Sequence, residues 1–188
     1  MLIANLIGVF FFLYFYWRRL KEDYQTEKIF NAGFILIIGV CVGIVLATYL
    51  LPNNWFWIIA TSLFVAQLIV VYKLKLKPYE SFEALIISSL PWLALCFLAN
   101  SIQLSSLTDF LRFWLSLTSI FLFFLFDNFY RTFFWYKSGR IGFSGLATLG
   151  IFFLVNLLFP ASYWDKIFSG TVVFLSFLLL YNLSKQDD

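Results

Sequence analysis

The feature that most constrains this chain is a series of seven long apolar runs separated by short polar turns. A bilayer core about 30 Å thick needs roughly 20 mostly apolar residues for each helical crossing, and each run approaches that length. Because backbone groups find no water partner in hydrocarbon, each run is expected to be a helix. The runs are Met1–Trp17, Ile29–Leu51, Trp55–Tyr72, Ala84–Leu104, Phe110–Tyr130, Ile141–Pro160 and Ile167–Leu183.

Composition supports this interpretation. The chain is 62% hydrophobic and 12% charged, whereas a soluble domain is about 45–50% apolar and about 25% charged. The first run is not interpreted as a signal peptide, because Arg18 and Arg19 follow it instead of preceding it. The sequence therefore predicts an all-α integral membrane protein with seven transmembrane helices, forming a single polytopic domain over residues 1–188.

The distribution of basic residues predicts the orientation. Two of the 13 Lys and Arg residues, Arg112 and Lys166, fall on one side of the predicted membrane. The others fall on the opposite side: Arg18, Arg19, Lys21, Lys28, Lys73, Lys75, Lys77, Arg131, Lys137, Arg140 and Lys185. Cytoplasmic loops carry the excess of Lys and Arg. We therefore expect the N-terminus outside and the C-terminus in the cytoplasm, in a cell membrane of bacterial type.

The residue inventory excludes several kinds of site. The chain has no His, so imidazole bases and His-ligated metals are absent. Its two cysteines, Cys41 and Cys96, lie in apolar runs and cannot form a four-cysteine metal site. We therefore expect no metal and no cofactor. The net charge of +3 resides in the loops, and no nucleic-acid partner is expected.

Ionisable residues inside predicted membrane helices are the usual indicators of function, and few occur here. Asp127 and Arg131 are four residues apart, which predicts an intramembrane ion pair near the cytoplasmic side. A proton site or a headgroup site is the alternative interpretation of this pair. Asp109 and Arg112, at the outer end of the same run, are interpreted as a solvated cap. Asn and Gln residues within the runs are interpreted as helix-packing groups.

Residues 136–146 combine two basic side chains with three glycines at the start of the sixth run. Backbone N–H groups at a helix start, together with Lys137 and Arg140, suit an anionic phosphate headgroup. A tight cytoplasmic turn that carries charge only to set the topology is an equally acceptable interpretation.

Several segments resemble the prolipoprotein diacylglyceryl transferase family. Ile29–Phe34 contains an Ala-Gly-Phe start, and Gly39 and Gly43 match glycines of the following family segment, where Cys41 stands in place of an Arg. Phe97–Asn100 stands where the family has Arg-Leu-Gly-Asn, with Asn100 retained and Phe97 replacing the Arg.

Later segments follow the layout of the same family without its functional groups. Gly142–Leu146 is similar to the start of the family's late helix, but Phe152, Phe153, Asn156 and Leu157 occupy the region where that helix presents an Arg and a Glu. The family's His-Gly-Gly motif is also absent, since Trp57, Ile58 and Ile59 fill its place.

The resemblance implies an enzyme that moves a diacylglyceryl group from phosphatidylglycerol to the cysteine thiol of a prelipoprotein. Its partners would be an anionic phospholipid and a prelipoprotein or other membrane proteins, and its headgroup candidates are Lys137, Arg140 and Asn100. Because the cationic pocket for the leaving phosphate is missing, we expect a lipid-holding protein whose chemistry is altered or lost, with no catalytic residue assigned. The alternative is a non-catalytic helical subunit or scaffold within a larger membrane complex. A small transporter is less favoured, because convergent charges and matched broken helices are absent.

Overall fold

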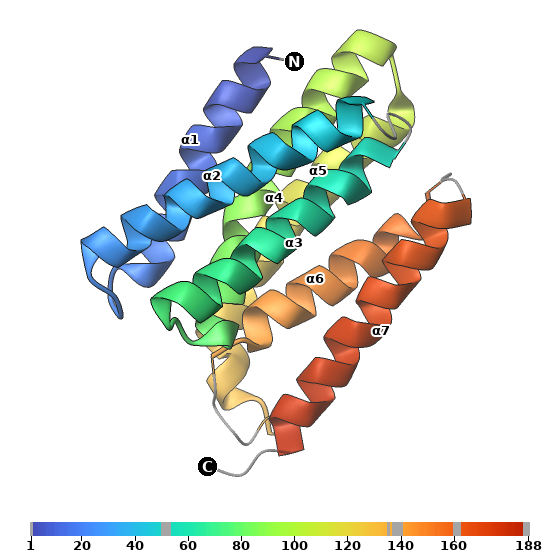
Figure 1. Ribbon diagram of the computed structural model, residues 1–188. Coiled ribbons are helices and arrows are strands. Elements are labelled where there is room, and N and C mark those ends of the chain that lie inside the picture. The colour runs from blue at the N-terminus through green and yellow to red at the C-terminus, as the bar shows by residue number, and fades with distance from the viewer. Residues whose placement is uncertain (1, 50–53, 135, 137–140, 160–162, 186–188) are drawn as a thin grey trace. The chain divides into compact units, whose positions relative to one another are not determined.

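The computed structural model describes residues 2–49, 54–134, 136, 141–159 and 163–185. Over this part of the chain the seven apolar runs form seven α-helices in sequence order, with no β-strand (Figure 1). The elements are α1 (Leu2–Leu20), α2 (Thr26–Tyr49), α3 (Trp55–Leu74), α4 (Pro78–Leu104), α5 (Leu107–Phe129), the 3₁₀ turn η2 (Tyr130–Thr132), α6 (Phe143–Asn156) and α7 (Tyr163–Lys185). The predicted all-α class is confirmed.

Five of the described helices are long and apolar enough to cross a membrane: α2, α3, α4, α5 continued through η2, and α7. This is the pattern of a membrane protein. Helix α6 has only 14 residues, which at 1.5 Å per residue gives about 21 Å and falls short of the hydrocarbon thickness. The seven-crossing count and the orientation therefore stay predictions.

Helix α4 begins at Pro78, six residues before its predicted start. Proline suits the first helical position because its fixed backbone angle is helical and its missing N–H would have no intrahelical partner. Glu80 lies in the first turn, where the helix dipole favours a negative charge. The added residues include three buried polar side chains, Glu80, Ser81 and Glu83. The predicted helix began after them because the prediction followed only the apolar run.

The chain forms two compact units. The smaller unit is Leu13–Leu85. In it α2 and α3 lie side by side as an antiparallel pair (Figure 1). Their backbones approach closely because small residues line the contact. A Cβ atom added to Gly39 would lie 2.5 Å from Ala66 Cβ, and one added to Gly43 would lie 3.0 Å from Ser62 Cβ. These glycines therefore allow the close helix approach that small residues permit in membrane proteins.

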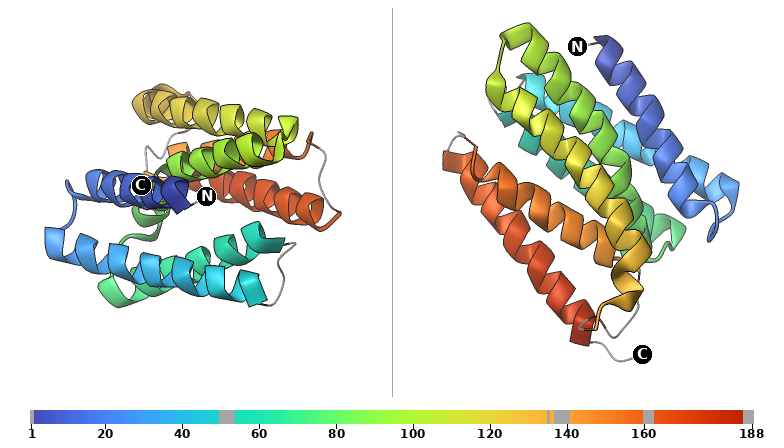
Figure 2. Two further views of the ribbon diagram at one scale, coloured as in Figure 1. Left: turned by 90° about the horizontal axis from the view of Figure 1, so that it is seen from above. Right: turned by 180° about the vertical axis from the view of Figure 1, so that it is seen from behind.

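The other compact unit comprises Met1–Phe12 and Ile86–Asp188. Within it α6 contacts both α5 and α7 and lies between them (Figure 2). The Gly150 position of α6 packs on the Phe177 ring of α7, which a Cβ at Gly150 would meet at 3.1 Å. On α1, Asn5 accepts a 3.2 Å hydrogen bond from the indole N–H of Trp92 on α4.

Candidate functional site

One cation of the larger unit lies among three helices. The Arg112 side chain, on the second turn of α5, is 20% exposed. Its Nε donates a 3.1 Å hydrogen bond to Asn156 Oδ1 at the end of α6. Its guanidinium carbon lies 5.9 Å from the centre of the Phe97 ring on α4. The helices thus bring together residues that are far apart in sequence.

Local sequence sets the position of this arginine. Ser105 takes a left-handed backbone conformation with φ of 49°, which closes the short turn between α4 and α5. The Ser106 hydroxyl then caps α5 by accepting from the Asp109 backbone N–H at 3.3 Å. Arg112 follows one turn later, on the same side of the helix as Asp109. The cap therefore fixes the face of α5 on which the guanidinium lies.

The guanidinium keeps hydrogen-bonding capacity. Arginine carries five N–H donors, and Asn156 uses one of them. The distance from Arg112 Nη1 to Asp109 Oδ1 is 3.6 Å, an ion pair that is longer than a hydrogen bond. The fork geometry of the remaining donors matches carboxylate and phosphate oxygens. The cluster can therefore accept an anion while the Asn156 bond holds the side chain in place.

Asp109 and Arg112 are less solvated than their interpretation as a solvated cap expects. Their side chains are 16% and 20% exposed, so each is only partly accessible. The sequence concealed this because the partner of Arg112 is 44 residues away. One signal was available: Arg112 is one of only two basic residues on its side of the predicted membrane, where the positive-inside rule gives no reason for a cation.

The three headgroup candidates fall into two groups. Asn100 lies on α4, one turn beyond Phe97 and therefore on the same helical side. Lys137 and Arg140 lie outside the described residues. Their described neighbours Tyr136 and Phe143 pack edge to face, and both rings contact the Tyr130 ring at the far end of α5. Helix α5 has 23 residues, about 34 Å of length, so Asn100 and this aromatic cluster lie near opposite ends of it.

The predicted Asp127–Arg131 ion pair stays a prediction. Helix α5 ends at Phe129, so Asp127 lies on the helix whereas Arg131 lies in η2. The Arg131 Nε donates a 3.1 Å hydrogen bond to the Tyr130 hydroxyl, and its guanidinium carbon lies 5.6 Å from the centre of the same ring. Arg131 is therefore positioned by an aromatic neighbour that spacing alone does not reveal.

A second polar cluster lies in the unit Leu13–Leu85. The Gln67 amide of α3 donates to the Ser81 hydroxyl of α4, which also contacts the Tyr16 hydroxyl of α1 at 3.4 Å. All three side chains are buried. Nearby on α4, Glu83 is paired with Arg19 of α1, with 3.3 Å between Oε1 and Nη2. These groups join three helices through polar contacts, as the packing interpretation of such residues predicts for Gln67.

The turn before α4 is fastened by a third set of contacts. The Tyr24 hydroxyl donates to Glu80 Oε2 at 2.8 Å and accepts from the Lys77 backbone N–H at 2.9 Å. The Lys77 ammonium donates to Glu80 Oε1 at 2.8 Å. Burial raises the pKa of Tyr24, and the adjacent Glu80 carboxylate raises it further. The hydrogen bond to Glu80 raises the pKa of Lys77.

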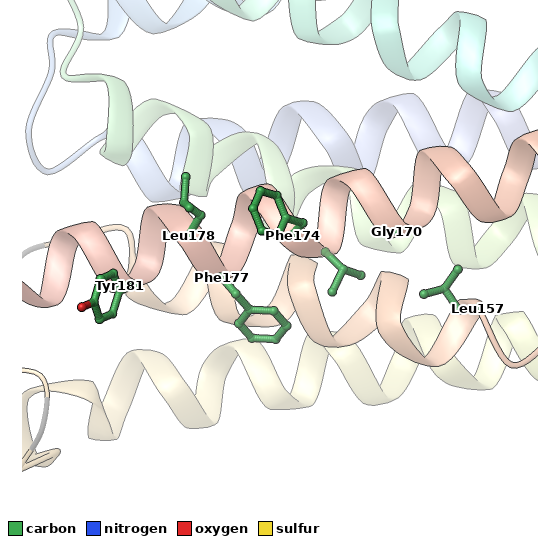
Figure 3. A pocket seen from close by; sticks show the side chains of 7 residues that line it. Leu157, Gly170, Phe174, Phe177, Leu178 and Tyr181 are labelled. Atoms are coloured by element: carbon green, nitrogen blue, oxygen red, sulfur yellow. The ribbon is translucent and has the colours of Figure 1, made fainter.

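The described residues contain no group of three or more His, Cys, Asp or Glu side chains that could hold a metal ion. One hollow among these residues is instead apolar. A groove of about 540 Å³ runs along α7, with Leu157 at one end and Tyr181 at the other (Figure 3). Its remaining lining residues are Gly170, Val173, Phe174, Phe177 and Leu178. This groove was not anticipated, because its residues read individually as ordinary lipid-facing positions.

Comparisons with known protein families, curated proteins and solved structures find no match to this chain. The functional argument therefore rests on the residues themselves and on the resemblance noted in the sequence.

Proposed function

We propose that this chain is a divergent membrane protein of the diacylglyceryl transferase type that holds an anionic phospholipid and has altered or lost the transfer chemistry. The supporting observation is the position of Arg112. It contacts Phe97, which stands where the resemblance places an Arg, and Asn156, which lies where the resemblance places an Arg and a Glu. The Arg112 cation from α5 thus lies beside Phe97 and Asn156, two positions at which the resemblance implies charged side chains and this chain has none.

The proposed topology supports an outer-leaflet lipid. With the N-terminus outside, the turn between α4 and α5 faces outward, and Arg112 lies five residues into α5. At 1.5 Å per residue this is about 8 Å from the helix end. A long basic side chain at this depth reaches the headgroup region, where a lipid phosphate lies. In this proposal α1 and α6 complete the seven crossings, and the short α6 requires local thinning of the bilayer.

The proposed loss of chemistry follows from the groups around Arg112. Diacylglyceryl transfer must stabilise a phosphate leaving group and help a cysteine thiol to ionise. Arg112 is partly neutralised by Asp109, and the chain has no His to act as a base. Removing one stabilising donor of this kind typically lowers a rate about 10²–10³-fold. We therefore expect binding without turnover.

The test compares lipids retained by the purified protein, using native mass spectrometry after exchange with phosphatidylglycerol and phosphatidylcholine. Arg112→Gln should reduce the preference for phosphatidylglycerol roughly tenfold, since a charge-assisted hydrogen bond contributes about 1.5–3 kcal/mol. Asp109→Asn should increase the preference, because it removes the competing carboxylate. A thermal melt in the same detergent checks that both variants fold.

Lys137→Gln combined with Arg140→Gln is the matched comparison. If this pair lowers the phosphatidylglycerol preference and Arg112→Gln does not, the headgroup site lies in the 137–140 segment and the role of Arg112 is wrong. A transferase assay in nanodiscs, with phosphatidylglycerol and a lipobox peptide, completes the test. We expect no diacylglyceryl mass shift beside an active control enzyme.

A further inference from the structure

The apolar groove along α7 is linked to the Arg112 cluster through two consecutive residues of the chain. Leu157 lines one end of the groove and directly follows Asn156, which accepts the hydrogen bond from Arg112. From there the lining is hydrocarbon and aromatic ring, apart from the Tyr181 hydroxyl at the far end. A polar, cationic end that continues into an apolar channel has the chemical order of a phospholipid, with its headgroup first and its acyl chain after it.

The length of the groove is close to half the thickness of the hydrocarbon core. From Gly170 to Tyr181 there are eleven helical steps, which amount to roughly 17 Å along α7. Half of the hydrocarbon core is about 15 Å. Gly170 is the eighth residue of α7, so the groove begins about 11 Å from the helix start, slightly deeper than Arg112 lies in α5. The two helices run in the same direction, so both depths are measured from the same side. The groove ends at Tyr181, about 27 Å from the helix start, which is beyond the midplane of a core about 30 Å thick.

The floor of the groove is fixed from within the protein. The Phe177 ring packs on Gly150 of α6, so it cannot swing freely into the groove. Gly170 has the opposite environment, because a Cβ atom added there would meet nothing within 4 Å. Glycine inside a helix costs about 1 kcal/mol relative to alanine. Its presence at an uncontacted position keeps the upper part of the groove open.

We propose that this groove binds an acyl chain of the anionic phospholipid whose headgroup Arg112 holds. The inference rests on the proposed function and extends it by assigning the chain to α7 between Gly170 and Tyr181. A second apolar hollow of about 400 Å³ also borders Phe177 and Tyr181, but it lies toward the other end of α6, away from Arg112. The hydrogen bond from Arg112 to Asn156, the chain neighbour of Leu157, is what selects the first groove.

The experiment fills the groove without touching Arg112. Gly170→Trp places an indole in the open space, whereas Leu175→Trp adds an indole to an exposed α7 position that does not line the groove. Occupancy of bound lipid is measured by native mass spectrometry with phosphatidylglycerol and phosphatidylcholine. Gly170→Trp should lower the occupancy of both lipids roughly tenfold, because apolar contact equivalent to two or more methylenes is lost. Leu175→Trp should leave occupancy unchanged.

The outcomes separate this inference from the proposed function. Loss of headgroup preference in Arg112→Gln together with normal occupancy in Gly170→Trp would overturn the groove assignment and retain the headgroup site. Unchanged preference in Arg112→Gln would overturn the proposed function, and with it this inference. If the same spectra show a wild-type dimer that Gly170→Trp converts to monomers, the groove binds a second copy of the chain and the acyl-chain assignment is wrong. Gly170→Leu, which adds less bulk, repeats the test if the Trp variant does not fold.

Discussion

Arg19 and Glu83 form an ion pair between α1 and α4, with 3.3 Å between Nη2 and Oε1, and the Glu83 side chain is 1% exposed. A carboxylate withdrawn so far from water requires compensation by a cation and by hydrogen bonds. The arginine side chain, at 28% exposure, still reaches the surface. The pair therefore ties the end of α1 to the first turns of α4 inside the unit Leu13–Leu85.

Removing Arg19 should destabilise the protein more than removing both partners. Breaking a buried pair by deleting one member typically costs about 3–5 kcal/mol, whereas replacing both members with apolar groups is often nearly neutral. We expect Arg19→Met to lower the melting temperature strongly and Arg19→Met with Glu83→Leu to recover most of the loss. Thermal melts in one detergent measure both. A double variant as unstable as the single one would mean that the pair is not the source of the effect.

Gly39 should tolerate no side chain. A Cβ at this position would lie 2.5 Å from Ala66 Cβ, which forces α2 and α3 apart. Overpacking of this kind costs about 1–3 kcal/mol, so Gly39→Ala should lower the melting temperature. Gly170→Ala is the matched control, because a Cβ there meets nothing within 4 Å. It should leave stability unchanged or raise it by up to about 1 kcal/mol.

The order and class of the helices could be predicted from the sequence because hydrocarbon admits few backbone structures and the apolar runs have the required length. The ends of the helices were predicted less well. Helix α4 extends back to Pro78 through polar residues that are buried by tertiary contacts, such as Ser81 against Gln67. Local hydropathy contains no information about such partners, so it places the helix start too late.

The candidate site was harder to predict for the same reason. Arg112 takes its role from Asn156 and Phe97, which belong to other helices, and no short motif encodes that meeting. Asn100 was identified because the resemblance preserved it, and the structure places it one turn from Phe97. The groove on α7 depends on an empty space at Gly170, and the sequence does not show that space.

The contacts of Tyr24 should make stability sensitive to alkaline pH. The pKa values of Tyr24 and Lys77 are both raised above their ordinary values of 10.0 and 10.5. A group whose folded pKa is raised contributes its full stability below the unfolded pKa and loses it as the pH rises through the folded pKa. The melting temperature should therefore fall between about pH 9 and pH 12.

Tyr24→Phe with Lys77→Met should show a smaller alkaline fall, because the two titrating partners of Glu80 are gone. Lys73→Met, at an exposed position near the end of α3, is the control for general loss of positive charge. Melting curves across the pH range, recorded in one detergent, measure all three proteins. An identical alkaline fall in the double variant would show that other tyrosines and lysines control the response.

Ser81 and Gln67 should respond unequally to substitution, although they share a hydrogen bond. The Gln67 Oε1 atom is buried and has no hydrogen-bond partner within the described residues. Gln67→Met removes this desolvated oxygen together with the donated bond, so the two effects offset and stability should change by less than about 1 kcal/mol. Ser81→Ala instead leaves the Gln67 amide without its acceptor and should cost about 1–3 kcal/mol. Thermal melts of the two variants check this order. The reverse order would mean that Gln67 binds a water or ligand. Losing that bound molecule would then cost more stability than is gained by removing the buried Oε1 atom.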